Sequence, residues 1–512
     1  MEIVCRRGTL LGAQLANVRV GIPSLVARER LVVISGQADG NTGDFLKFID
    51  ATPVKRMTGG FTEQMSALGK GRLHLKLELP IGNLAATKLA GEYQFANNSL
   101  TLHPQLPPVE HATGKVGFTE STLAVNDVRG RLFGGPLAVS GGSRPGGAGI
   151  EVVAKGEATL AGVRPVFDSP WRRYLSGAAA YSATLQVRDG RTRISVDSPL
   201  RGISSALPAP LAKSAPDTLP LRIEVIPADG GARDRISLTL GRLAAAEFDL
   251  RRQGEAMVVR KAAIWLTPSP GQPVQLPEQP GTRIYGSLAA LSIDRWIALA
   301  ATDGGGGAAA VDLDVKIGAL DVYGKRINEV SMRGAVDAAG WAVMLTAKEL
   351  AGNLSHRGGQ LIARLTHLQV PEDYPGAKPQ ELSQPKDLPA VDLITERFIY
   401  HEKELGRVEV VAQPAGEDWR LEKLAWKSPE ASLTGKGIWR PGSPSRTSAD
   451  FELAAADCGK FLERVGYANL VKGGSARLQG SLAWNGDPLA IDYPSLSGHV
   501  QMQAEDGQFL EV

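Results

Sequence analysis

The sequence predicts a mainly β protein, in which many short strands form an elongated, mostly antiparallel sheet capped by a few short helices. The first observation is strict alternation of apolar and polar residues in several segments. The second is that 59 glycines and 32 prolines are spread along the 512 residues, which is typical of short strands joined by turns. The third is internal repetition, which usually indicates a stacked architecture.

The clearest strand pattern covers residues 72–79, where every second residue is leucine and the others are polar or charged. Similar alternation covers residues 219–225, 236–240 and 311–317. Because successive side chains of a strand point to opposite faces, each segment has one apolar and one polar face. Such strands are typical of antiparallel sheets with one solvated surface.

Helical periodicity is confined to residues 44–49, 169–175, 292–299 and 457–465. Each stretch has only about two turns, so it needs tertiary contacts to be stable, and we expect its apolar side to rest on the sheet. The aromatic residues expected to anchor these helices on the sheet are Phe45, Phe48, Trp171, Trp296 and Phe461.

Two repeats support a stacked sheet. Each helical stretch is followed by a Gly- or Ala-rich turn and then by an alternating strand, so this module occurs four times. The second repeat is a hairpin followed by a Trp-led strand, with Tyr323, Lys325, Ile327, Val330 and Trp341 matched by Tyr400, Lys403, Leu405, Val408 and Trp419. At about 8–12 residues per strand and turn the chain holds roughly 25–30 strands, which would span on the order of 120–140 Å in one sheet.

The charges do not indicate a nucleic-acid partner. The 57 basic and 54 acidic residues are interleaved and give a net charge of +3, without the Lys/Arg block that follows a phosphate backbone. Cys5 and Cys458 lie at opposite ends of the sequence, so we interpret them as separate thiols. The start contains no apolar run of signal-peptide length, and no segment is long enough for a membrane-spanning helix.

No constellation of residues predicts catalysis, a metal or a cofactor. His103 and His111 lie on either side of a Pro-rich turn, and solvated loop histidines are the simpler interpretation. Asp312 and Asp314 share one strand face, but Lys316 continues that face, so we expect an ordinary solvated surface. Neither a Gly-x-Ser-x-Gly motif nor a phosphate-binding loop is present.

Glycine and apolar spacings over most of the chain carry a family resemblance. The segments GKVGF (114–118), VNDVRGR (125–131) and LFGGP (132–136) resemble the central region of the YhdP family, which comprises AsmA-like proteins of Gram-negative envelopes. The C-terminal AsmA-like part of that family is similar to FLERVGY (461–467), GGSARLQGSLAW (473–484), LSGHV (496–500) and GQF (507–509).

The resemblance implies a long, twisted sheet curled into an elongated groove with an apolar interior. The family is implicated in moving phospholipid between the inner and outer membranes and in maintaining the outer-membrane barrier. It works in the periplasm, anchored by an inner-membrane helix that this chain lacks, so we expect an interior to C-terminal fragment. Residues 1–390 would form central groove repeats, and residues 391–512 an AsmA-like region that continues the sheet and is truncated at its end.

We therefore expect a non-enzymatic segment that conducts phospholipid acyl chains, with no cofactor, and with the two membranes as partners of the full-length protein. The alternative is a structural or adhesive β-repeat scaffold whose apolar faces are packed shut, and a diverged hydrolase ranks last. The residues expected to line the groove are Leu73, Leu75, Leu77, Leu79, Val311, Leu313, Val315 and Ile317.

Overall fold

The structure is a computed structural model that describes residues 2–10, 13–24, 30–50, 65–83, 86–102, 106–144, 149–167, 170–188, 191–228, 232–254, 256–300, 310–373, 385, 388–488 and 491–510. The described part is mainly β, with thirty strands and a few short helices, as the alternating pattern predicts. The chain divides into two units, Met1–Leu207 with Leu211–Ala262, and Pro208–Pro210 with Ala263–Val512. The division falls within strand β17 (Ala256–Leu266).

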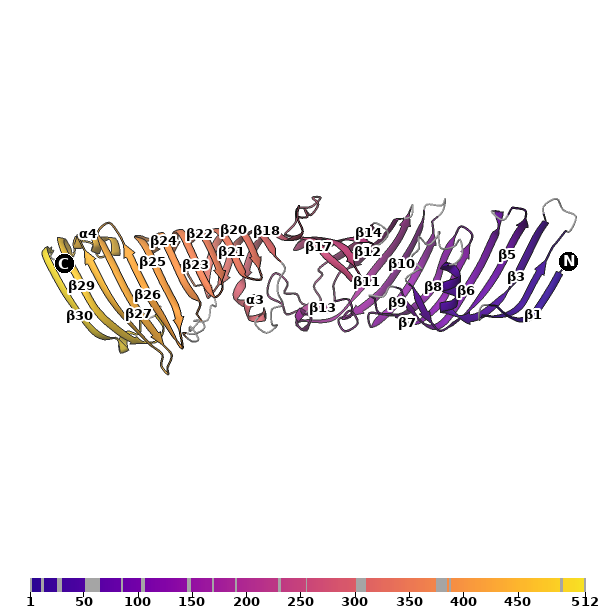
Figure 1. Cartoon of the computed structure of the whole chain (residues 1–512), viewed down its shortest axis with the longest axis horizontal. Coiled ribbons are helices and arrows are strands. Elements are labelled where there is room, and N and C mark those ends of the chain that lie inside the picture. The colour runs from indigo at the N-terminus through magenta and orange to yellow at the C-terminus, as the bar shows by residue number, and fades with distance from the viewer. Residues whose placement is uncertain are drawn as a thin grey trace. The chain divides into compact units, whose positions relative to one another are not determined.

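The first unit is an antiparallel sheet whose strands follow one another in chain order (Figure 1). Two short strands depart from this order, because β4 pairs with β6 and β13 pairs with β11. Its elements are β1 (Glu2–Leu10), β2 (Ala13–Gly21), β3 (Arg30–Asn41), α1 (Thr42–Asp50), β4 (Ser66–Leu68), β5 (Lys70–Ile81), β6 (Lys88–Thr101), β7 (Val109–Thr119), β8 (Leu123–Leu132), β9 (Gly135–Ser143), β10 (Ile150–Thr159), the 3-10 helix η4 (Pro170–Tyr174), β11 (Leu175–Arg188), β12 (Arg191–Ser198), β13 (Ile203–Ser205), β14 (Leu221–Ala228), β15 (Arg233–Leu240) and β16 (Ala244–Gln253).

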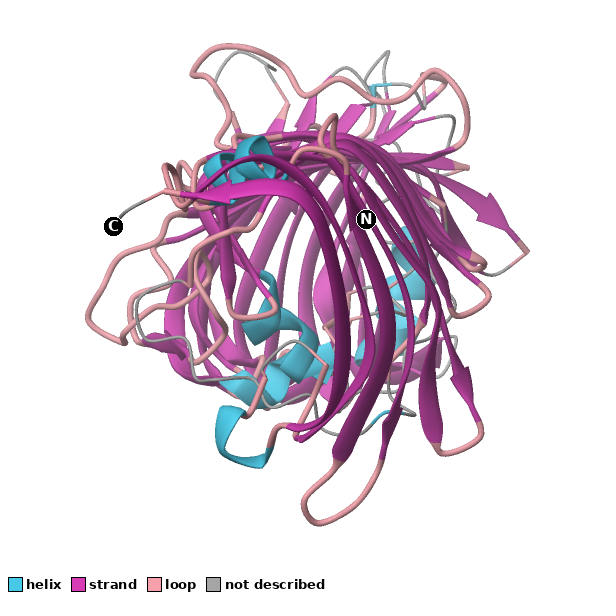
Figure 2. Cartoon of the chain, turned by 90° about the vertical axis from the view of Figure 1, so that its left-hand side faces the viewer, coloured by secondary structure: helices cyan, strands magenta, loops and turns pink. Residues whose placement is uncertain are grey.

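The second unit is a mixed sheet, in which β18 pairs with β19 and β23 with β24 in parallel, and the other described pairs are antiparallel. Its strands are bent along their length when viewed from the C-terminal end (Figure 2). Its elements are β18 (Gly281–Ser292), α3 (Ile293–Ala300), β19 (Val311–Val322), β20 (Lys325–Asp337), β21 (Gly340–Thr346), β22 (Leu350–Arg357), β23 (Gln360–Gln369), β24 (Ala390–Tyr400), β25 (Lys403–Ala415), β26 (Asp418–Lys427), β27 (Ala431–Arg440), β28 (Arg446–Ala455), α4 (Cys458–Val465), β29 (Val471–Asn485), the 3-10 helix η7 (Tyr493–Ser495) and β30 (Ser497–Phe509).

The hairpin repeat predicted from the sequence is confirmed. Lys325 is the first residue of β20, and Lys403 is the first residue of β25. The strand before each of them, β19 or β24, pairs in parallel with the strand that precedes it in the chain. Trp341 and Trp419 are each the second residue of the strand after the hairpin. The two copies therefore share element boundaries, as their common residues predict.

Three expectations need correction. Residues 170–174 form a 3-10 helix of five residues, because so short a stretch gains little from α-helical hydrogen bonds. The strand expected from residue 219 begins at Leu221, since Pro220 has no N–H to donate to a ladder. Gly473 and Gly474 lie inside β29 rather than in a turn, and their φ angles of 63° and 80° bend the strand while pairing continues.

Both cysteines carry free thiols, with Cys5 exposed, as the sequence predicts. None of the helices that the structure describes is long and apolar enough to cross a membrane.

Candidate functional site

One face of the second unit carries an apolar row that crosses the strands at right angles. Directly paired residues of neighbouring strands lie on the same face of a sheet, so the register assigns them. From β19 to β30 the row contains Val315, Met332, Leu345, Gly352, Leu365, Thr395, Val408, Trp426, Leu433, Leu453, Leu478 and Met502. Thr395 is its one hydroxyl side chain, and it is fully buried.

The first unit carries an equivalent row on one face of its sheet. From β1 to β16 this row contains Gly8, Leu15, Ala38, Leu73, Tyr93, Val116, Val125, Gly141, Val152, Leu185, Ile194, Val225, Ile236 and Phe248. We call the face that bears the row the apolar face of each unit. Such a row forms only if each strand pairs with its neighbour in the register that places apolar residues side by side. No single segment of the sequence therefore reveals it.

The opposite faces are polar and are crossed by ion pairs between neighbouring strands. In the first unit Arg72 pairs with Asp39 at 2.7 Å. In the second unit Lys423 pairs with Glu409 at 2.6 Å. Because three of these four side chains are more than 40% exposed, each pair contributes little stability, about 0–1 kcal/mol. These pairs show that charged side chains gather on one face of each sheet and apolar side chains on the other.

No second layer of described residues covers either apolar face. Within each unit, the extensive contacts of a strand are with its sheet neighbours and with the connecting helices. The accessible surface of the protein is 30599 Å², whereas two globular proteins of half its mass would together expose roughly 22,000 Å². The larger area is in keeping with apolar faces that no second layer covers, and it does not favour a pair of closed sandwiches.

The structure places the eight residues expected to line a groove on these apolar faces. Leu73 is in the row of the first unit, and Leu75, Leu77 and Leu79 alternate with it along β5. They are partly buried, apart from the buried Leu73.

On β19 the apolar face is more tightly packed. Val315 and Ile317 are 6% and 3% exposed within a cluster that includes Val330, Leu345 and Leu365. Val311 and Leu313, by contrast, are only partly buried. The packing comes from neighbouring strands and from the start of α3. The row residues of β25–β29, by contrast, are only partly buried.

The short helices carry aromatic side chains toward the apolar faces. Phe45 of α1 contacts Tyr93 of the row with ring centroids 4.9 Å apart, and the Tyr93 hydroxyl donates a hydrogen bond to Thr42 at 2.7 Å. Phe461 of α4 lies 5.8 Å from Trp426, again a row residue. Two helices in different units therefore meet an aromatic side chain of the row in the same way.

The other expected anchors differ. The indole N–H of Trp296 in α3 donates to the carbonyl oxygen of Ala209 at 3.4 Å. Trp171 in η4 remains 44% exposed. The Phe48 side chain lies outside the described residues.

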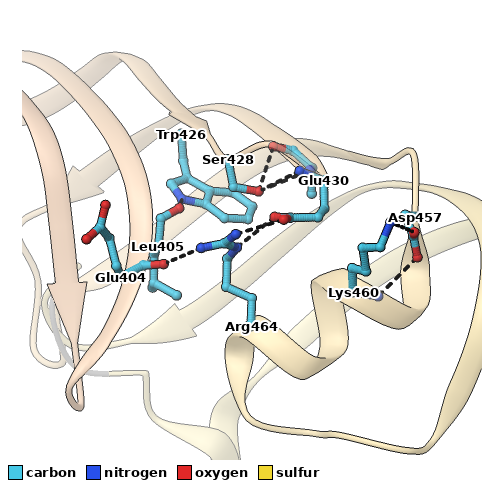
Figure 3. A network of polar contacts seen from close by, with 9 residues as sticks. Glu404, Leu405, Trp426, Ser428, Glu430, Asp457, Lys460 and Arg464 are labelled. Carbon is cyan, nitrogen blue, oxygen red and sulfur yellow. Dashed lines mark hydrogen bonds and ion pairs between the residues drawn. The ribbon is translucent and has the colours of Figure 1, made fainter.

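An arginine fixes α4 to the sheet (Figure 3). Nε and Nη2 of Arg464 lie 2.6 Å and 2.7 Å from the two carboxylate oxygens of Glu430, and Nη1 donates to the carbonyl oxygen of Glu404 at 2.9 Å. The hydrogen bond from Arg464 lowers the pKa of Glu430 below its ordinary value of 4.5. At the other end of the helix, Asp457 accepts a hydrogen bond from the Lys460 backbone N–H at 3.0 Å, as N-cap residues do.

Three tryptophans lie on β26, β27 and β29, at the ends of these strands away from α4. Trp419 pairs with Trp439, which pairs with Thr447, and Thr447 pairs with Trp484. Trp439 lies six positions after Leu433 of the apolar row on β27, which corresponds to about 20 Å along a strand. The apolar strip between α4 and the tryptophans is therefore wider than one bilayer leaflet's hydrocarbon, about 15 Å.

The candidate metal and carboxylate residues are not brought together by the part of the chain that the structure describes. No group of three or more His, Cys, Asp or Glu side chains that could hold a metal ion occurs among them. His103 lies outside the described residues, and His111 Nδ1 is 2.7 Å from Asn97 Oδ1. Asp314, one of the paired carboxylates, forms an ion pair with Arg333 at 3.4 Å.

Sequence reasoning missed the tryptophan line and the Arg464–Glu430 pair. The tryptophans come from strands far apart in the sequence, and only the register aligns them. Arg464 and Glu430 are 34 residues apart and lie on different elements. The one local signal was Phe461 at the apolar side of a short helix.

Comparisons with known proteins place the chain among relatives of similar sequence. A family model described as YhdP protein matches residues 1–512. The chain is 24% identical over 529 residues to the intermembrane phospholipid transporter YhdP of Escherichia coli (strain K12), an alignment that covers 98% of this chain and 41% of that protein. The chain thus spans about two fifths of the length of this relative. No solved structure matches.

Proposed function

Since the chain belongs to the YhdP family, we propose that its apolar faces bind and conduct the acyl chains of phospholipids. The E. coli relative is named an intermembrane phospholipid transporter. By extension, this chain would act without catalysis in the periplasm, between the inner and outer membranes, and would support the outer-membrane barrier.

The observation that carries the proposal is that an apolar row runs across the strands of each unit, on a face that no second layer of described residues covers. Each methylene exposed to water costs about 0.8 kcal/mol, so a two-chain lipid with ~30 methylenes meets a barrier on the order of 20 kcal/mol in water. An apolar face removes most of this cost. Aliphatic side chains also hold an acyl chain without directional bonds, and conduction requires sites that release their occupant.

We assign the contact with acyl chains to the lining residues predicted from the sequence. Leu75, Leu77, Leu79, Val311 and Leu313 are partly buried on the apolar faces, which leaves side-chain surface for a lipid. Leu73, Val315 and Ile317 are buried, so their part would be to shape the surface beneath the lipid. We keep the division into central repeats (1–390) and an AsmA-like region (391–512) as part of the proposal.

Photo-crosslinking tests the proposal, with neighbouring residues as matched controls. A benzophenone amino acid replaces Leu75 or Leu478 on the apolar face, and Lys76 or Gln479 on the polar face of the same strand. After irradiation in cells, the apolar positions should capture phospholipid and the polar positions should not. Capture of protein alone at Leu75 and Leu478 would instead support the closed scaffold and end the lipid proposal.

A charge on the apolar face provides the functional test. Leu75→Asp should block lipid transfer, because an ionised carboxylate in the path of an acyl chain must be desolvated. Lys76→Asp adds the same carboxylate on the polar face of the same strand and should leave transfer intact. Val315→Asp is a poor choice, since Val315 is packed in a cluster and its replacement would disturb the fold. Normal transfer with Leu75→Asp would contradict the assignment of the path.

A further inference from the structure

A shallow hollow lies where α4 meets the ends of two strands. It has a volume of about 370 Å³ and is lined by three cationic side chains, Lys403, Lys460 and Arg464, and three carboxylates, Glu404, Glu430 and Glu463. Its volume is within the range of small-molecule sites, about 300–1,000 Å³. The formal charges cancel, so the hollow does not suit a ligand with a large net charge of either sign.

Most of these charges are already paired within the protein. Arg464 is bound to Glu430 at 2.6 Å, Lys460 lies 3.0 Å from Asp457, and Glu404 pairs with Arg397 outside the hollow at 3.0 Å. Figure 3 shows the first two of these contacts on either side of the helix.

Two opposite charges remain. Among the residues that the structure describes, the Lys403 ammonium and the Glu463 carboxylate have no ion-pair or hydrogen-bond partner. Lys403 is half-buried, and its ammonium lies against Gly466, the residue that ends α4. A half-buried, unpaired ammonium is a ready partner for an anion. Glu463 is exposed and free to meet a cation.

The hollow adjoins the apolar face. Phe461, one helical turn before Arg464, contacts Trp426 of the apolar row. The indole N–H of Trp426 donates to the carbonyl oxygen of Leu405, two residues after Lys403. A molecule whose polar end occupies the hollow can therefore lay its apolar part across β25–β29, where the strip is wide enough for an acyl chain.

We propose that this hollow binds the headgroup of a zwitterionic glycerophospholipid, with its phosphate at Lys403 and its ammonium at Glu463. The inference rests on the proposed function and adds a headgroup preference to it. The paired Arg464 and Lys460 fix the walls of the hollow, and the two unpaired charges recognise the ligand. A phosphate and a primary amine in one headgroup match both charges, whereas an anionic headgroup satisfies only Lys403.

Binding of short-chain lipids to the purified chain tests the proposal by titration calorimetry. The probes are dihexanoyl phosphatidylethanolamine, dihexanoyl phosphatidylglycerol, dihexanoylglycerol, glycerophosphoethanolamine and inorganic phosphate. Lys403→Gln should weaken binding of both phospholipids about three- to fivefold, the effect of one partly exposed charge pair. Glu463→Gln should weaken only the ethanolamine lipid, by a similar factor, and neither variant should change dihexanoylglycerol binding.

Controls separate the hollow from general electrostatics. Lys436→Gln removes an exposed lysine from the polar face of β27 and should change nothing, while Lys403→Arg should restore phospholipid binding. Unchanged phospholipid affinity in both Lys403→Gln and Glu463→Gln would overturn the headgroup site, while lipid capture at Leu478 would leave conduction standing. Binding of inorganic phosphate or glycerophosphoethanolamine as tight as that of the dihexanoyl lipids would assign the hollow to a soluble phosphate and also overturn the proposal.

Discussion

Replacing Glu430 by glutamine should release α4 from the sheet of the second unit. The carboxylate accepts two hydrogen bonds from Arg464, at 2.6 Å and 2.7 Å. Glu430 and Arg464 are only 14% and 28% exposed, so water replaces these bonds poorly. Glutamine keeps the size of the side chain, removes its charge and replaces one of the two acceptor oxygens by an NH2 donor, so the guanidinium keeps at most one neutral acceptor at position 430 besides the Glu404 carbonyl oxygen.

The magnitude follows from burial and geometry. A hydrogen bond to a charged group contributes about 1.5–3 kcal/mol when sheltered, and partial exposure reduces this contribution. We expect Glu430→Gln to cost about 1–2 kcal/mol in the local opening of α4, which corresponds to a five- to thirtyfold larger open population.

Hydrogen exchange measures this opening directly. The amides of Phe461 and Gly466, which bond to Asp457 and Glu463 within α4 and its cap, should exchange about five- to thirtyfold faster in Glu430→Gln. The control is Glu452→Gln, which breaks an ion pair of the same 2.6 Å length whose side chains are 43% and 61% exposed, and which should change exchange less than about threefold. Equal exchange in the two variants would refute the reasoning.

The same pair predicts a pH dependence. Arg464 lowers the pKa of Glu430 in the folded state, so the pair contributes its full stability above the ordinary value of 4.5 and loses it as pH falls through the lower, folded value. The difference in α4 opening between the native protein and Glu430→Gln should therefore be constant at neutral pH and shrink in acid. A difference that stays the same at pH 3 would contradict the ionic assignment.

Gly352→Ala should destabilise the second unit by about 2–4 kcal/mol, because φ is 148° and an added Cβ would meet the next strand's carbonyl oxygen at 2.2 Å. Gly416→Ala, at φ 67° in open space, should cost only about 1 kcal/mol, and chemical denaturation compares the two. Tyr93→Phe should cost about 1 kcal/mol through loss of its bond to Thr42, whereas Tyr181→Phe should be neutral, since no described group bonds its buried hydroxyl. Burial raises the pKa of Tyr181 to about 12, so alkaline absorbance titration should show a tyrosine that ionises near pH 12 and is missing in Tyr181→Phe.

Local pattern was sufficient for the strand-rich fold class, for three of the four short helices and for the polarity of the alternating strands. The leucines of residues 73–79 face one way because side chains in a strand alternate, whatever the strand pairs with. The helix at 457–465 was predicted from its periodicity, and α4 begins one residue after Asp457, which the structure shows to be its N-cap. The hairpin repeat was readable because like segments make like elements.

The sequence did not reveal which strands pair with one another, or how exposed each apolar side chain is in the folded sheet. Val315 and Leu313 look alike in the sequence, yet Val315 is buried and Leu313 is not, because the neighbours of β19 pack against one and leave part of the other free. The tryptophan line, the parallel pairs and the contact between Arg464 and Glu430 likewise depend on which segments meet.

The sequence by itself therefore determined that this protein is built of one-sided strands, and its family spacings indicated which proteins it is similar to. Only the tertiary structure decided that the apolar sides join into continuous rows. It also decided that Arg464 holds α4 to the sheet, and that Lys403 and Glu463 have no partner among the described residues beside this helix. The physical reason is that alternation is a property of neighbouring residues. Register, burial and ion pairing are set by contacts between residues far apart in the chain.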